Sequence, residues 1–224
     1  MLTAQGLIAL ADRVLTGAEA TRVLSLVHQH LDVEEQDQWM DLLTDLDGLS
    51  AHFDGLATPE GPPEAILEEL WSIALVDGDA SMAEVRMLER IGQTLGVDAA
   101  TVHEWRKAWT TEVIENGDFA ARFLATLIGA GEGATPSEED RAYFEKLVNG
   151  LPISLARRKK LLRFLERPPT VDALAQELAA VPEAKQAAAI ETIERILERS
   201  IHASAGKAQL ASLRQRMAKA AAAH

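Results

Sequence analysis

The chain contains no cysteine among its 224 residues. This absence excludes disulfide bonds, thiolate nucleophiles and cysteine-ligated zinc. The chain also lacks an apolar run that approaches the roughly 20 residues needed to cross a bilayer. Its N-terminus shows neither the basic segment nor the cleavage site of a signal peptide. We therefore expect a cytoplasmic protein, with peripheral association with a membrane as the alternative location.

Aromatic residues are scarce, at 4% of the chain, and runs of β-branched residues are absent. Alanine and leucine dominate instead, and the apolar fraction of 47% is sufficient to fill a core. This composition favours helices, and apolar residues recur at helical spacing along nearly the whole chain. The sequence therefore predicts an all-α fold of roughly ten to twelve helices, arranged as two similar bundles with short loops.

The net charge of −13 argues against nucleic acid as a partner. Acidic residues are concentrated in residues 1–115, which carry 22 acids and 6 bases, whereas residues 116–224 carry 13 acids and 16 bases. Such an asymmetry predicts two units with different tasks. The segment Glu115–Asp118, with the sequence ENGD, is the predicted break between them.

One motif recurs where a predicted helix ends and the next begins. It is a carboxylate followed seven residues later by a glutamate, and it occurs as Asp12 with Glu19, Asp77 with Glu84, and Glu132 with Glu139. A fourth corner has the same outline but carries Ser200 and Lys207. The spacing of the four corners predicts a tandem duplication of a two-corner unit of about 110 residues.

The first unit would supply four carboxylates, from Asp12, Glu19, Asp77 and Glu84. A divalent cation requires several converging oxygen ligands, and calcium or magnesium prefers such a set over nitrogen or sulfur. We therefore predict a calcium or magnesium site there and no organic cofactor. The second unit offers fewer carboxylates, so we interpret its corners as degenerate.

Ordinary helix capping is the competing interpretation of the two glutamates. Glu84 lies three residues after Ser81, and Glu19 three residues after Thr16, which is the spacing of a capping box. Capping explains Asp12 and Asp77 less well, because an acid at a helix C-terminus opposes the helix dipole. Both interpretations of the glutamates stay open at the level of sequence. Downstream, Thr135 and Pro136 are predicted to begin a later helix.

A basic amphipathic segment, ARRKKLLRFLER, lies in the second half of the chain. Its four consecutive cations are Arg157, Arg158, Lys159 and Lys160. A solvated helix face is one interpretation, and a docking surface for an acidic protein or an anionic membrane is the other. We predict protein partners for this surface.

Catalytic motifs are missing from the sequence. It contains no glycine-rich phosphate loop, no G-x-S-x-G nucleophile elbow and no H-E-x-x-H. A carboxylate cluster that acts with a metal ion as Lewis acid is the remaining catalytic hypothesis. We expect a protein that is not an enzyme.

The segment ALVDGDASMAEVRMLERIGQTLGV, residues 74–97, resembles the signature of tellurite-resistance TerB-like domains. GEGATPSEEDRAYFEKLV, residues 131–148, resembles the first motif of a second, diverged copy. The resemblance implies an all-helical fold, metal binding by the acidic residues of two turns, and a role in stress response and membrane-linked complexes. Arg13 departs from it, because the family has a glycine there.

The resemblance yields two functional hypotheses. In the first, the chain is a TerB-like stress-response scaffold that binds a divalent cation through the four motif carboxylates. In the second, it is a metal-independent helical adaptor that contacts proteins or an anionic surface.

Overall fold

The structure is a computed structural model, and it describes residues 1–13, 17–57, 59–76, 78–129, 136–198, 200 and 202–222. These residues form twelve α-helices and one short 3₁₀ helix, and no strand occurs among them. The all-α prediction and its helix number are confirmed. The chain divides into two compact units, Met1–Thr110 and Thr111–His224.

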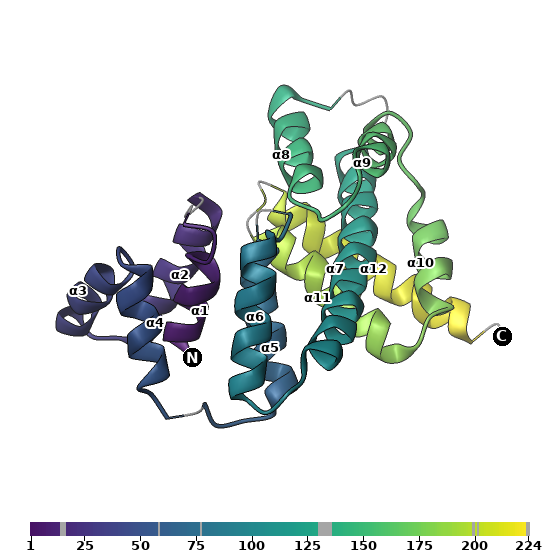
Figure 1. The fold of residues 1–224 in the computed structure, drawn as a ribbon. Helices are drawn as coiled ribbons and strands as arrows, with labels where there is room; N and C mark the ends of the chain where they lie inside the picture. Colours follow the sequence, from purple (N-terminus) through teal and green to yellow (C-terminus); the bar gives the residue numbers. More distant parts are fainter. Residues whose placement is uncertain are drawn as a thin grey trace. The chain divides into compact units, whose positions relative to one another are not determined.

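The first unit is arranged around its N-terminal helix (Figure 1). Its helices are α1 (Leu2–Ala9), α2 (Gly17–His30), α3 (Val33–Leu42), α4 (Leu46–Asp54), α5 (Pro63–Ala74), α6 (Met82–Thr94) and the first part of α7 (Ala99–Ile128). Helix α1 packs against α2, α4, α5 and α6, and all its side chains from Thr3 to Ala9 are buried. Because α1 is buried on every side and contacts four other helices, it lies at the centre of this unit's packing.

The tryptophans of the first unit are mostly core residues. Trp39, Trp71 and Trp109 are buried. The Trp71 indole N–H donates to the Thr110 hydroxyl over 2.9 Å, so its polar end is satisfied as burial requires. Helix α7 is therefore fixed to α5 at the end of the first unit.

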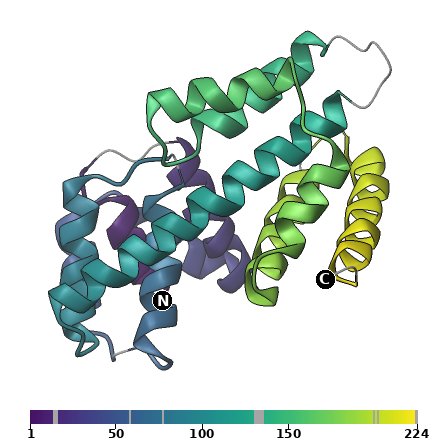
Figure 2. The same ribbon diagram turned by 90° about the vertical axis from the view of Figure 1, so that its right-hand side faces the viewer.

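The second unit has its own apolar core, which includes Phe123 and Phe144. Its helices are the rest of α7, α8 (Glu138–Asn149), α9 (Leu155–Leu162), the 3₁₀ helix η1 (Arg163–Leu165), α10 (Val171–Ala179), α11 (Glu183–Glu198) and α12 (Ala203–Ala221). Helices α10 and α12 pack side by side (Figure 2).

The interruption of helical structure predicted at Glu115–Asp118 does not occur. Helix α7 continues from Ala99 to Ile128 through this segment (Figure 2). The reason is packing: the Leu151 side chain lies where a Cβ on Gly117 would be, so the glycine serves close contact rather than a turn. The division between the units falls inside this helix, at Thr110 and Thr111.

The predicted start of the later helix is also displaced. Helix α8 begins at Glu138, with Ser137 as its N-cap in a capping box with Asp140. Pro136 therefore precedes the helix, and Thr135 lies outside the described residues.

Candidate functional site

The two corners of the first unit have the same kind of backbone turn. Leu10 is the C-cap of helix α1, and Leu75 is the C-cap of helix α5. The Arg13 N–H donates to the Leu10 carbonyl over 2.9 Å, and the Gly78 N–H donates to the Leu75 carbonyl over 3.0 Å. Both residues are left-handed, with φ of 64° at Arg13 and 95° at Gly78. Arg13 thus adopts the conformation that favours glycine, at the position where the sequence repeat expects one.

Helix α6 begins with the predicted capping box. The Glu84 N–H donates to the Ser81 hydroxyl over 3.2 Å, and the Ser81 N–H donates to Glu84 Oε2 over 2.6 Å. The capping interpretation of Glu84 is therefore confirmed. The matching interpretation of Glu19 stays a prediction, because its partner Thr16 lies outside the described residues.

Capping uses only one oxygen of Glu84. The residue is 3% exposed, and its other oxygen, Oε1, is buried without a hydrogen-bond partner. A buried carboxylate oxygen without a partner is unfavourable, because folding has removed its water. Glu19 is also buried, at 4% exposure, whereas Asp12 is exposed. Helix capping alone therefore leaves half of the Glu84 carboxylate unexplained.

The electrostatics of Glu84 connect the two corners. Burial raises the pKa of Glu84 to about 7 from its ordinary value of 4.5, against the opposing effect of the Ser81 hydrogen bonds. The negative charges of Glu19 and Asp12 raise the pKa of Glu84 further. The packing of α1 against α5 and α6 thus brings acids from both corners into one another's field.

The fourth predicted ligand, Asp77, lies outside the described residues. Across the rest of the described chain, no group of three or more histidine, aspartate or glutamate side chains is placed so as to hold a metal ion. Asp12, Glu19 and Glu84 are therefore neighbours electrostatically without forming a complete coordination shell by themselves.

Residues 2–107 match the family model for tellurite resistance protein TerB. This part of the chain is a TerB domain. The match covers nearly all of the first compact unit and includes both acidic corners. No curated protein and no solved structure matches the chain.

The match to TerB ends before the second unit, so the diverged second copy stays a prediction. The described part of α8 shows a different register from the one predicted. By its capping box, Asp140 rather than Glu139 takes the position that Glu84 has in the TerB domain. Glu139 is exposed, and Glu132 lies outside the described residues. The sequence signal for this register was the spacing from Ser137 to Asp140.

Asp140 is paired with a histidine that the sequence analysis did not single out. Its Oδ1 lies 2.5 Å from His202 Nε2, which joins the start of α8 to the start of α12. Burial raises the pKa of Asp140. Hydrogen bonds from Ser137 and His202 lower it by more than burial raises it, so the net shift is downward. Ser200, a predicted corner residue, is buried and its hydroxyl accepts from the His202 N–H. Lys207 is exposed.

The four predicted docking cations of α9 differ in their surroundings. Arg157 donates to Asp118, and Arg158 donates to the Leu151 carbonyl over 3.1 Å. Lys159 and Lys160 are exposed, and neither forms an ion pair with any described residue. None of the described helices is both long enough and apolar enough to span a bilayer.

Proposed function

We propose that the TerB domain binds a divalent cation through Asp12, Glu19, Asp77 and Glu84, and that the chain acts as a tellurite-resistance-type helical scaffold. In this proposal the cation joins the α1–α2 corner to the α5–α6 corner. Such a bridge would hold the two helical hairpins in one arrangement and present a fixed surface to partner proteins.

The unpartnered Oε1 of Glu84 carries the proposal. It belongs to a buried carboxylate whose proton affinity is raised by two further acids, which is the electrostatic condition that a bound cation relieves. We include Asp77 among the ligands because it corresponds to Asp12: the Gly78 N–H donates to the Leu75 carbonyl as the Arg13 N–H donates to the Leu10 carbonyl. An all-oxygen donor set suits calcium or magnesium.

Calorimetric titration of the full chain with calcium, magnesium and manganese tests the proposal. We expect one saturable site per chain and its loss in Asp77→Asn/Glu84→Gln. Glu139→Gln is the matched control, since that exposed carboxylate belongs to the other unit. If none of the three ions produces heat, or if the double variant binds as the parent does, the cation site is ruled out.

A second candidate function, the metal-independent adaptor, is favoured by the surface of α9. Lys159 and Lys160 are exposed, and Lys159 follows Leu155, which is 66% exposed, at the i+4 position of α9, so a cation and an apolar side chain are presented on one helix face. That combination suits an anionic surface. Arg157 and Arg158 contribute less, because each already has a partner within the unit.

Co-sedimentation with phosphatidylglycerol vesicles, in chelator, tests the adaptor function. We expect binding that weakens with salt and is lost in Lys159→Glu/Lys160→Glu, with phosphatidylcholine vesicles as the neutral comparison. The adaptor function would be contradicted if the parent chain sedimented equally with both lipids, or if the parent and the Lys159→Glu/Lys160→Glu variant sedimented equally with phosphatidylglycerol.

A further inference from the structure

Helix α3 exposes apolar side chains on the side that faces away from the core of the first unit. Its inner side carries Trp39, which is 8% exposed, and α3 packs against α2 and α4 (Figure 1). On its outer side, Val33 is 73% exposed and Met40 is 44% exposed. These two residues lie seven positions apart, which is about two helical turns, so they share one face of the helix.

The same face of α3 carries negative charge. Asp37 follows Val33 by four residues and Asp41 follows Met40 directly, and both aspartates are exposed. No lysine or arginine occurs between Arg22 and Arg86. Neither aspartate forms an ion pair with any residue that the structure describes. We call this surface the α3 face, and it consists of Val33, Asp37, Met40 and Asp41.

Helix α9 presents the opposite charge at the same spacing. Lys159 follows Leu155 by four residues, as Asp37 follows Val33, and Lys160 is also exposed. Residues 155–167 contain six cations and a single carboxylate. We call this surface the α9 face, and it consists of Leu155, Lys159 and Lys160.

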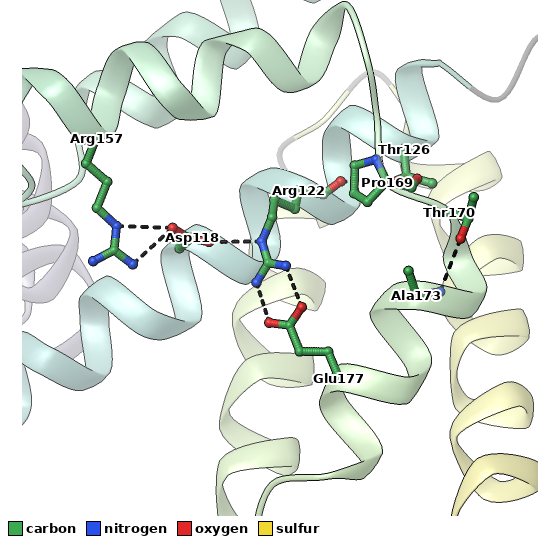
Figure 3. A network of polar contacts seen from close by, with 8 residues as sticks. All are labelled: Asp118, Arg122, Thr126, Arg157, Pro169, Thr170, Ala173 and Glu177. Atoms are coloured by element: carbon green, nitrogen blue, oxygen red, sulfur yellow. Dashed lines mark hydrogen bonds and ion pairs between the residues drawn. The ribbon is translucent and has the colours of Figure 1, made fainter.

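The other cations of α9 point elsewhere. Arg157 donates to Asp118 Oδ2 of α7 through Nε over 3.1 Å and through Nη2 over 3.0 Å (Figure 3). Leu161, one helical turn after Arg157, is 1% exposed, so this side of α9 packs into the second unit. Leu155 is 66% exposed, which places it with the two free lysines on the outer side.

We infer that the α9 face of one copy of this chain docks on the α3 face of a second copy. The apolar side chains of the two faces pack together in this contact, and the two lysines pair with the two aspartates. No ligand of the proposed cation site lies on either face, so the contact is independent of that site.

Charge complementarity identifies the second copy as the occupant. Two α3 faces repel each other, and so do two α9 faces, whereas the unlike faces attract. The contact is therefore heterologous: each copy offers one face to the other's opposite face. Exposed ion pairs contribute little by themselves, so the apolar side chains are needed as well. Two short helices make a small interface, which predicts a weak association that depends on protein concentration.

Sedimentation velocity of the full chain over a range of concentrations, in chelator and without lipid, tests this inference. We expect an average mass that rises above that of one chain at low salt. It should fall back in about 1 M salt, where the screening length is only about 3 Å. The absence of lipid separates this result from the vesicle experiment, which uses the same lysines.

Reversing the charge of either face should weaken the association about tenfold or more, because like charges then oppose each other. The two variants are Lys159→Glu/Lys160→Glu and Asp37→Lys/Asp41→Lys. Matched controls reverse exposed charges outside both faces and should associate as the parent does. They are Lys207→Glu/Lys219→Glu on α12 and Glu104→Lys/Glu112→Lys on α7.

Mixing the two face variants is the decisive measurement. Each variant alone presents two faces of the same sign, but in the mixture each face meets one of opposite sign on the other variant. We therefore expect the mixture to associate as the parent does. Recovery in the mixture also shows that both variants are folded, and circular dichroism of each checks this separately.

Three results would overturn the inference. The parent chain may sediment as a single copy at every concentration, or a face variant may associate as tightly as the parent. The third is a mixture that stays as dissociated as its two components while circular dichroism shows both to be helical.

Discussion

At the scale of single residues, the TerB domain contains a backbone conformation and a carboxylate that are both unfavourable in isolation. Arg13 holds a left-handed φ of 64°, and Glu84 keeps a buried oxygen without a partner. Such features persist only where surrounding packing imposes them, and they occur most often at functional sites. Both lie at the corners that carry the motif carboxylates.

Replacing Arg13 by glycine should stabilise the protein. A left-handed conformation costs a non-glycine residue about 1–2 kcal/mol, and glycine removes this cost. Part of the gain is lost, because glycine also increases the conformational entropy of the unfolded chain. We expect a net stabilisation of about 1 kcal/mol, measured by urea denaturation. Arg22→Gly within α2 is the control and should destabilise by about 1 kcal/mol. A destabilised Arg13→Gly would mean that the arginine side chain contributes more than the turn costs.

Glu84 should make the protein less stable as the pH rises. Its folded pKa of about 7 exceeds the ordinary value of 4.5, so the folded state binds its proton more tightly than the unfolded state does. This contribution is fully present below pH 4.5 and is lost as the pH rises through 7, by at most about 3 kcal/mol. In chelator, denaturation across this range should show a decline that Glu84→Gln lacks. A decline of the same size in both proteins would contradict the assignment.

At the scale of elements, helix ends determine how each unit is joined. In the TerB domain, Glu84 at the start of α6 lies in the electrostatic field of Glu19 in the first turn of α2 and of Asp12 after α1, whereas in the second unit Asp140 and His202 link α8 to α12 directly. In the second unit, the pair of Asp140 with His202 joins the start of α8 to the start of α12. In the basic cluster of α9, Arg157 already pairs with Asp118 of α7 and is therefore less available to a partner.

Two adjacent acids of α8 should differ in their effect on stability. Asp140 caps the helix and contacts His202, whereas Glu139 is exposed. We expect Asp140→Ala to destabilise the protein by about 1–2 kcal/mol, because it removes the capping box and the partner of His202. Glu139→Ala should change the free energy of unfolding by less than about 0.5 kcal/mol. Equal effects in urea denaturation would refute the register in which Asp140 corresponds to Glu84.

At the scale of the whole molecule, one helix belongs to both units. Helix α7 continues past Thr110, where the two compact units divide. Its amide groups at Asn116 and Gly117 are therefore part of a helical ladder, and Gly117 is buried beneath Leu151. The helix is therefore continuous where the sequence predicted a break, at Glu115–Asp118.

Hydrogen exchange measured by mass spectrometry should show this continuity. Amides of residues 115–118 are expected to exchange slowly, because exchange requires the opening of α7. The turn at Gly55–Ala57 after α4 should exchange fast and serves as the internal comparison. Equally fast exchange in the two segments would contradict the continuity of α7 through residues 115–118.

Local features were predictable because their determinants lie within a few residues. Asp98 accepts from the Thr101 N–H at the start of α7, Pro63 takes the first position of α5, and Gly96 ends α6 with a φ of 79°. The Ser81–Glu84 capping box followed from spacing in the same way. These interactions are set by backbone geometry, so the sequence contains nearly all the information.

Distant contacts were not predictable. Gly117 was interpreted as a break because its partner, Leu151, lies in another part of the sequence. The pairs of Arg122 with Glu177 and of Asp140 with His202 join residues 55 and 62 positions apart, and no local sequence pattern predicts them.

The sequence alone determined the helical class, the acidic corners and the resemblance to TerB, because periodicity, helix caps and short motifs are encoded by neighbouring residues. The tertiary structure alone decided that Glu84 is buried beside Glu19 and Asp12, that α7 is continuous, and that Arg157 pairs with Asp118 whereas Lys159 and Lys160 stay exposed. Burial and long-range pairing depend on which helix faces meet, and that choice is made by the packing of the whole chain.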